Sequence, residues 1–92
     1  MANSVAVEGN LARYHALVRV GRNHPEEQKA IMDELGSPMK AARRSARVVL
    51  SHKYRAEFAE YYAEERKQRG LPPLTWMLAY GIKPWEAVHG GE

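Results

Sequence analysis

The sequence predicts an all-α fold, a single small domain over residues 1–92 with three main helices and short helical turns near the C-terminus. Three observations predict it. Apolar residues recur at helical spacings, Pro and Gly stand where helices should begin and end, and the stretch between Met39 and Arg69 contains neither Gly nor Pro. Ninety-two residues allow one domain with one small core.

The first helix is expected at about residues 5–20. Its apolar stripe, with spacings of four, three and four, consists of Val7, Leu11, Tyr14 and Val18. Because Gly9 and Asn10 interrupt this pattern, a start at Asn10 as the N-cap is favoured over a start at Ser4. Apolar residues within 11–20 also alternate as in a strand, but the abundance of Ala, Leu and Arg favours a helix.

The second helix is expected at about residues 25–35. Pro25 suits the first helical position, and Gly36 suits a left-handed C-cap. Ser37 is then placed to cap the next helix, with Pro38 at its first position. The predicted buried stripe of the second helix consists of Gln28, Ile31, Met32 and Leu35.

The third helix is expected to be long, at about residues 38–69. Its first half projects basic residues on one side and apolar residues, among them Met39 and Val49, on the other. In the second half the two sides exchange, with aromatic residues where the basic ones were. Either the helix breaks near Ser51-His52, or it is continuous and packs a different side at each end. The absence of Gly and Pro favours the continuous helix.

The C-terminal segment is expected to form one or two short helical turns within residues 75–89. Thr75 is a candidate cap for the first turn, which Gly81 ends, and Pro84 opens the second. Gly70 and Pro72-Pro73 end the long helix before this segment.

The excess positive charge lies in one segment. Residues 37–55 carry six basic residues and no acid, whereas residues 1–36, 56–70 and 71–92 each sum to −1, which gives the net charge of +3. A localised patch of this kind attracts an anionic partner. The residues expected to bind nucleic acid are Lys40, Arg43, Arg44, Arg47 and Arg55.

Residues 31–47 place Leu35 and Gly36 before a basic helix, and this arrangement resembles a helix-turn-helix DNA reader. The resemblance implies that Arg43, Arg44 and Arg47 contact bases or phosphates and that Lys40 contacts phosphate. The chain departs from the motif at Met32, where a small residue is usual, and at Ser37, where a buried aliphatic residue is usual.

Aromatic residues gather in the second half of the long helix and in the C-terminal segment. A stripe of this kind is a core or helix–helix contact, a stacking platform for bases, or a surface for a protein partner. The candidate protein-interface residues are Tyr54, Phe58, Tyr61, Tyr62, Trp76, Tyr80 and Trp85.

The sequence contains no pattern that indicates catalysis. It has no cysteine, no histidine pair at metal-ligand spacing, no acid–base dyad and no Gly-rich phosphate loop, so we expect neither an enzyme nor a metal or other cofactor. With no signal-peptide pattern and no apolar run of roughly 20 residues, we expect a cytoplasmic protein without membrane or small-molecule partners.

The expected function is non-catalytic binding of nucleic acid, as a small regulator or accessory factor. The alternative is a modulator that binds an acidic protein surface, such as a small phage-type inhibitor acting through the long helix and the aromatic C-terminal segment. A third interpretation is a homodimeric assembly or scaffolding subunit whose long helices pair.

Overall fold

The computed structural model describes residues 4–36 and 38–85. All regular secondary structure over these ranges is helical. The elements in chain order are α1 (Ser4–Asn23), α2 (Pro25–Leu35), α3 (Met39–Lys53), α4 (Arg55–Gln68) and the 3₁₀ helix η1 (Thr75–Tyr80). The predicted all-α class is therefore confirmed, and the strand interpretation of residues 11–20 is wrong because they lie within α1. None of the described helices is long and apolar enough to cross a membrane.

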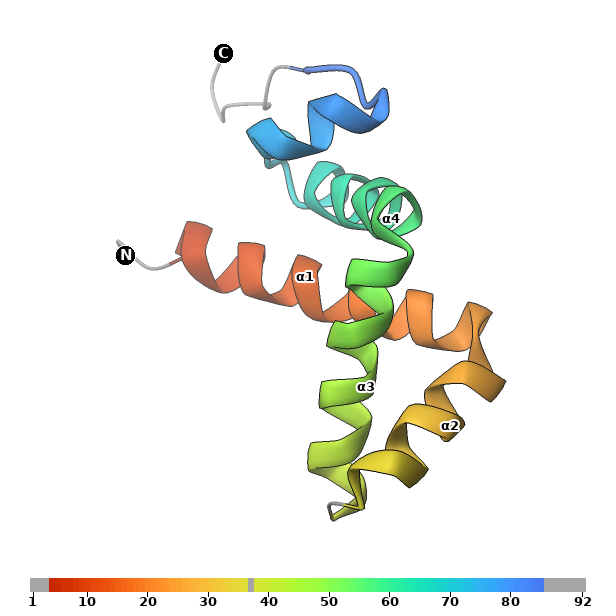
Figure 1. Cartoon of the computed structure of the whole chain (residues 1–92). Helices are drawn as coiled ribbons and strands as arrows, with labels where there is room; N and C mark the ends of the chain where they lie inside the picture. Colours follow the sequence, from red (N-terminus) through yellow and green to blue (C-terminus); the bar gives the residue numbers. More distant parts are fainter. Residues whose placement is uncertain (1–3, 37, 86–92) are drawn as a thin grey trace.

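The predicted single helix over residues 38–69 is wrong, because the segment forms two helices that meet at Tyr54 (Figure 1). Tyr54 has φ −108° and ψ 55°, outside the helical range, and the break lies close to the predicted alternative at Ser51-His52. The Tyr54 ring stacks on His24 at 3.6 Å between centroids, and its hydroxyl bonds to the Glu27 carboxylate. Tertiary contacts therefore accompany a break that no Gly or Pro marks.

The break resolves the exchange of sides seen in the sequence. α3 buries Ala42, Ala46, Leu50 and Ser51, whereas α4 buries Phe58, Ala59, Tyr62 and Ala63. Because the chain turns between the two helices, each can direct its own buried side inward.

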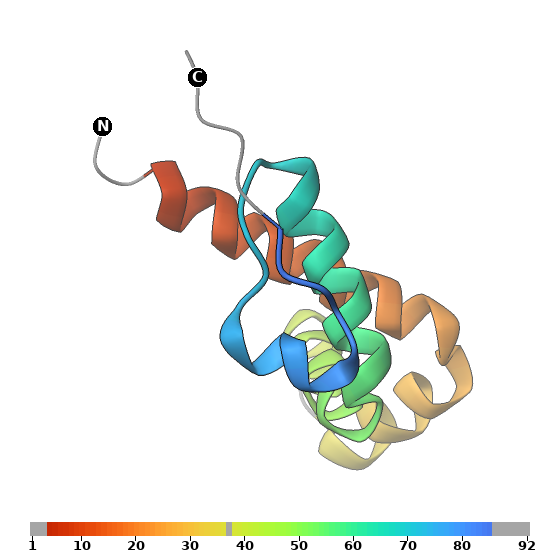
Figure 2. The same ribbon diagram turned by 90° about the horizontal axis from the view of Figure 1, so that it is seen from above.

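The core lies where α1 packs across α3 and α4. Figures 1 and 2 show α1 crossing α3 and running alongside α4. Alanines on both α1 and α4 are buried in this contact, and such small side chains allow two helices to approach closely. The buried cluster consists of Ala12, Ala16, Leu17, Val20, Leu50, Phe58, Ala59, Tyr62, Ala63 and Met77.

α1 does not bury the stripe that the sequence predicted. Val7, Leu11 and Tyr14 are exposed and Val18 is half-buried, whereas the buried positions lie on roughly the opposite side of the helix. The reason is the small size of the buried residues: Ala12 and Ala16 fit against α4 where larger residues would hold the helices apart.

α2 begins at Pro25 as predicted, and Gly36 closes it in the left-handed conformation with φ 60°. α2 has no fully buried residue, so its predicted buried stripe is only partly correct: Ile31 and Met32 are half-buried, whereas Leu35 is exposed. The predicted cap Ser37 lies outside the described residues. α3 begins at Met39, and Pro38 therefore precedes the helix.

The segment after α4 returns along that helix (Figure 2). Trp76 stacks on Phe58 with 6.1 Å between ring centroids, and Met77 is fully buried. The helical turn predicted from Thr75 is present as η1. A second turn is absent up to Trp85, and its remaining part lies outside the described residues.

Candidate nucleic-acid interface

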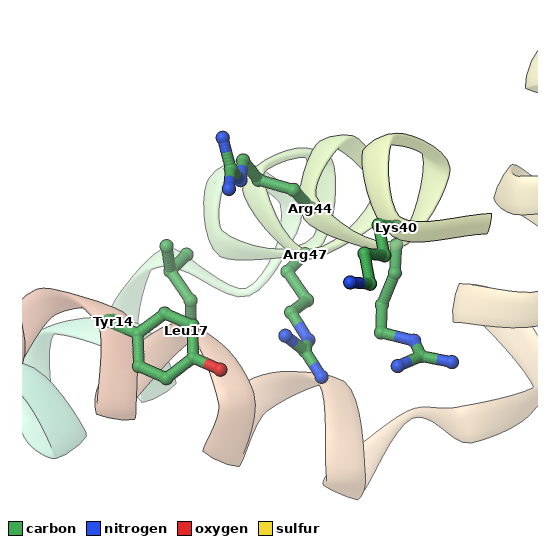
Figure 3. Close-up of a pocket in the computed structure, with 6 residues that line it drawn as sticks. Tyr14, Leu17, Lys40, Arg44 and Arg47 are labelled. Carbon is green, nitrogen blue, oxygen red and sulfur yellow. The ribbon is translucent and has the colours of Figure 1, made fainter. Parts of the chain in front are cut away.

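Four of the predicted basic residues surround one open hollow in the angle between α1 and α3 (Figure 3). The hollow has a volume of about 270 Å³. Figure 3 shows Arg47 extending from α3 into the space beside Tyr14, whose hydroxyl points toward it. The lining residues are Tyr14, Leu17, Lys40, Arg43, Arg44 and Arg47.

Helical geometry explains why the cations gather there. At about 100° per residue, the four basic side chains fall on one side of α3 within roughly 100° of arc. The adjacent side buries Ala42 and Ala46. The aliphatic part of the Arg47 side chain packs close to Gly21 of α1. A Cβ added at this glycine would lie 3.3 Å from Cγ of Arg47, which is a tight contact. The basic side of α3 therefore faces the angle with α1.

The apolar side of α3 differs from the prediction. Of the four residues expected to face inward, Ala42 and Ala46 are buried as predicted, whereas Met39 and Val49 are 67% and 47% exposed. Arg47, expected to face outward, is half-buried. Ala41, Ser45 and Val49 are exposed and uncharged, and the cations Lys40, Arg43 and Arg44 are exposed as well.

The hollow carries positive charge without local compensation. No acidic residue lines it, and within residues 4–36 and 38–85 none of its four cations forms an ion pair. Nε of Arg47 is buried and has no hydrogen-bond partner in that part of the chain. A buried donor without a partner costs free energy, so an anion that accepted a bond from it would stabilise the site.

A second hollow of about 340 Å³ adjoins the first, because the two share Tyr14, Leu17 and Arg44 as lining residues. Its other lining residues are Asn10, Arg13 and Val48. We name the cations along both hollows the basic track. The basic track consists of Lys40, Arg43, Arg47, Arg44 and Arg13.

Arg55 does not belong to this surface. It opens α4, and its guanidinium lies 3.8 Å from the ring centroid of Trp76, where it makes a cation–π contact. The structure therefore brings four of the five predicted basic residues together and leaves Arg55 in a packing role beside η1.

Most of the aromatic interface candidates are engaged within the chain. Phe58 and Tyr62 are buried, and Trp76 covers them. Tyr54 stacks on His24, and Tyr61 receives a hydrogen bond from an asparagine side chain and a cation–π contact from an arginine. These contacts match the core reading of the aromatic stripe.

Two aromatic candidates remain near the surface. Tyr80 is 43% exposed and meets Trp76 edge to face. Trp85 lines a shallow hollow of about 400 Å³ beside α4, together with Glu60, Glu64 and Lys67. Because this hollow has both signs of charge, it does not single out one class of partner.

A polar cluster ties α2 to the break between α3 and α4. Hydrogen bonds from Lys53 and Tyr54 to the Glu27 carboxylate hold the pKa of Glu27 below its usual value. The same bonds raise the pKa of Lys53 and of Tyr54. His24 Nε2 lies 3.1 Å from Glu57 on α4, next to this cluster. The cluster therefore joins α2 to the break, and a hollow of about 260 Å³, which His24 and Glu27 help to line, lies beside it.

Sequence reasoning missed the contribution of α1 to the site. Tyr14 was assigned to the packing stripe of its helix, and Asn10, Arg13 and Leu17 were not considered as binding residues. The one indication of a binding role in this part of the sequence was the pair Arg13-Tyr14, a cation next to an aromatic residue. Only the crossing of α1 over α3 places this pair beside Arg44. Among the described residues no group of three potential ligands could hold a metal ion.

Comparison of the chain with protein-family models, curated proteins and solved structures finds no match.

Proposed function

We propose that the protein binds nucleic acid without catalysing a reaction, through phosphate contacts from Lys40, Arg43, Arg44 and Arg47. The observation that carries the proposal is the hollow that these four cations share, where no acidic residue of the described chain pairs with them. Like charges this close repel one another, so their arrangement favours an anionic ligand over the empty site.

Phosphate suits the side chains present. The guanidinium fork of arginine matches two phosphate oxygens at once, and its weak hydration lowers the cost of leaving water. Three arginines and one lysine along one helix side fit a chain of phosphates better than a single small anion. Such a protein would act as a cytoplasmic regulator or accessory factor by covering a segment of the nucleic acid that it binds.

A second candidate is an acidic protein segment. The exposed stripe of Val7, Leu11 and Tyr14 on α1 leads to the same hollow, and an acidic amphipathic helix would match both features. A homodimeric scaffold is a third candidate, and sedimentation at high protein concentration tests it, since a monomer throughout would contradict it.

Charge reversal at the hollow tests the proposal. Arg43→Glu with Arg47→Glu should abolish the binding of a fluorescent DNA or RNA oligonucleotide at low salt, measured by anisotropy. The control, Lys67→Glu with Lys83→Glu, lowers the net charge by the same amount on exposed residues of another hollow. The control should bind nearly as well as the original protein. Equal binding by both double variants, with circular dichroism showing both folded, would refute the site.

A further inference from the structure

The basic track lies inside an angle between helices, and this position bears on which form of nucleic acid it fits. We propose that the track binds a single strand, with the ring of Tyr14 stacked on one base. This inference rests on the proposed function and specifies its ligand. Two features carry it: the direction in which the cations of α3 face, and the position of Tyr14 between the two hollows.

The position of the α3 cations beside α1 disfavours reading of duplex DNA. A recognition helix enters the major groove with its outermost side toward the base edges. The four cations of α3 that could take this role share their hollow with Tyr14 and Leu17 of α1. Because residues of α1 form part of this hollow, α1 occupies space beside the cations that the groove of a duplex would need. The helix-turn-helix resemblance of residues 31–47 therefore does not extend to a basic reading surface.

A single strand is narrow and flexible enough to enter the angle. The α3 part of the track, from Lys40 to Arg47, rises about 10 Å along the helix axis. Arg44 and Arg13 continue it along the second hollow. We expect this path to neutralise on the order of three phosphates.

Tyr14 is placed to stack on a base while the cations hold the neighbouring phosphates. Its side chain is 55% exposed, its only aromatic contact in the described chain is edge to face with His15 at 5.6 Å, and it lines both hollows. Aromatic stacking beside a positively charged groove is the usual means of binding single strands without sequence preference. Tyr80 is similarly exposed but lies in neither hollow of the track, which makes it a matched control.

The first experiment compares ligands on the full chain. Anisotropy titrations use a labelled ten-nucleotide oligothymidylate, a ten-base-pair duplex and a polyglutamate peptide. We expect the single strand to bind at least about tenfold more tightly than the duplex. Equal or tighter duplex binding would overturn the single-strand inference and leave the proposed function intact. Binding of neither nucleic acid would overturn both, and preferential binding of polyglutamate would assign the site to an acidic protein.

The second experiment tests the stacking contact. Tyr14→Ala should weaken oligothymidylate binding by about tenfold, with the salt dependence unchanged because no charge is removed. Tyr14→Phe should retain the affinity, since it keeps the ring, and Tyr80→Ala should have no effect. Full affinity in Tyr14→Ala would overturn the stacking role. An equal loss in Tyr14→Phe would show that the hydroxyl, not the ring, makes the contact, and would overturn it as well.

Discussion

α3 and α4 were expected to be one helix, yet their charges behave in opposite ways. The cations of α3 that line the hollow have no acidic partners among the described residues. On α4 the glutamates are mostly paired: Glu64 and Glu65 bind Arg19 at 3.0 and 3.3 Å, and Glu57 binds His24. Ion pairs of α4 join the helices to one another, whereas on α3 only Lys53 has an acidic partner among the described residues.

The aromatic residues sharpen the contrast. On α4 they fill the core or support it, whereas the aromatic residue beside α3, Tyr14, is exposed in the angle that the cations line. Residue type alone does not tell a structural role from a binding role. The presence or absence of contact partners within the chain distinguishes the two roles. Substitutions on α4 and on α3 test each half of this comparison.

The largest effect is expected in the core of α4. Phe58→Ala should lower the free energy of unfolding by about 3–5 kcal/mol, because Phe58 is 2% exposed and its removal leaves a cavity beneath Trp76. Urea unfolding followed by circular dichroism measures the change. The control Tyr80→Ala should stay within about 1 kcal/mol of the original protein. Losses of similar size in both variants would contradict a core role specific to Phe58.

A smaller loss is expected from the paired charges. Arg19→Ala removes two ion pairs and a cation–π contact with Tyr61, and should cost about 1 kcal/mol of stability. Arg43→Ala removes a charge without an acidic partner and should change stability by less than about 0.5 kcal/mol. Urea midpoints of the two variants should therefore differ. The comparison between α3 and α4 fails if Arg43→Ala is the more damaging substitution.

A gain in stability is expected at Arg47. Arg47→Met keeps the apolar stem and removes a buried donor without a partner, so it should raise the free energy of unfolding by up to about 1 kcal/mol. The same variant should bind nucleic acid more weakly, because a residue that serves binding can lower the stability of the folded protein. Thermal unfolding and anisotropy on one protein sample measure both effects. Reduced stability together with unchanged binding would assign Arg47 to the fold instead.

The smallest effect is expected from the pH dependence of the Glu27 cluster. The folded pKa of Glu27 is lowered, so its contribution to stability is complete above its usual pKa of 4.5 and is lost as the pH falls through the folded pKa. The folded pKa values of Lys53 and Tyr54 are raised from 10.5 and 10.0, so their contributions are complete below about pH 10 and are lost as the pH rises through the folded values.

Glu27→Gln should flatten both ends of this profile, because the glutamine can accept a bond but carries no charge. Urea midpoints measured across the pH range test this, with Glu26→Gln on the exposed side of α2 as the control. An unchanged profile in Glu27→Gln would show that the cluster contributes nothing measurable.

Local patterns in the sequence predicted several elements correctly. Pro25, Gly36 and Gly81 mark boundaries that the structure confirms, because backbone preferences act within a few residues. The break at Tyr54 was not predicted as the favoured outcome, since its contacts with His24 and Glu27 come from residues far away in the chain.

The candidate site was predictable only in part for the same reason. The cluster of cations is visible in the sequence, because residues three and four apart share one side of a helix. The position of Arg55 depends on how α4 lies relative to α3, and the contribution of Tyr14 depends on how α1 crosses α3. The small side chains of Ala12 and Ala16 help to decide this arrangement of the helices. Periodicity instead favoured the stripe of Val7, Leu11 and Tyr14 that the structure leaves exposed.

The salt dependence of single-strand binding tests the central claim most directly, because the proposal ties its slope to the number of phosphates that the basic track neutralises. For roughly three phosphates, the logarithm of the association constant should fall with the logarithm of salt concentration with a slope of about −2. Arg43→Gln should make this slope shallower by about 0.7, while Arg55→Gln should leave it unchanged. A slope near zero, or equal slopes in Arg43→Gln and the original protein, would contradict the assignment of these cations to a nucleic-acid partner.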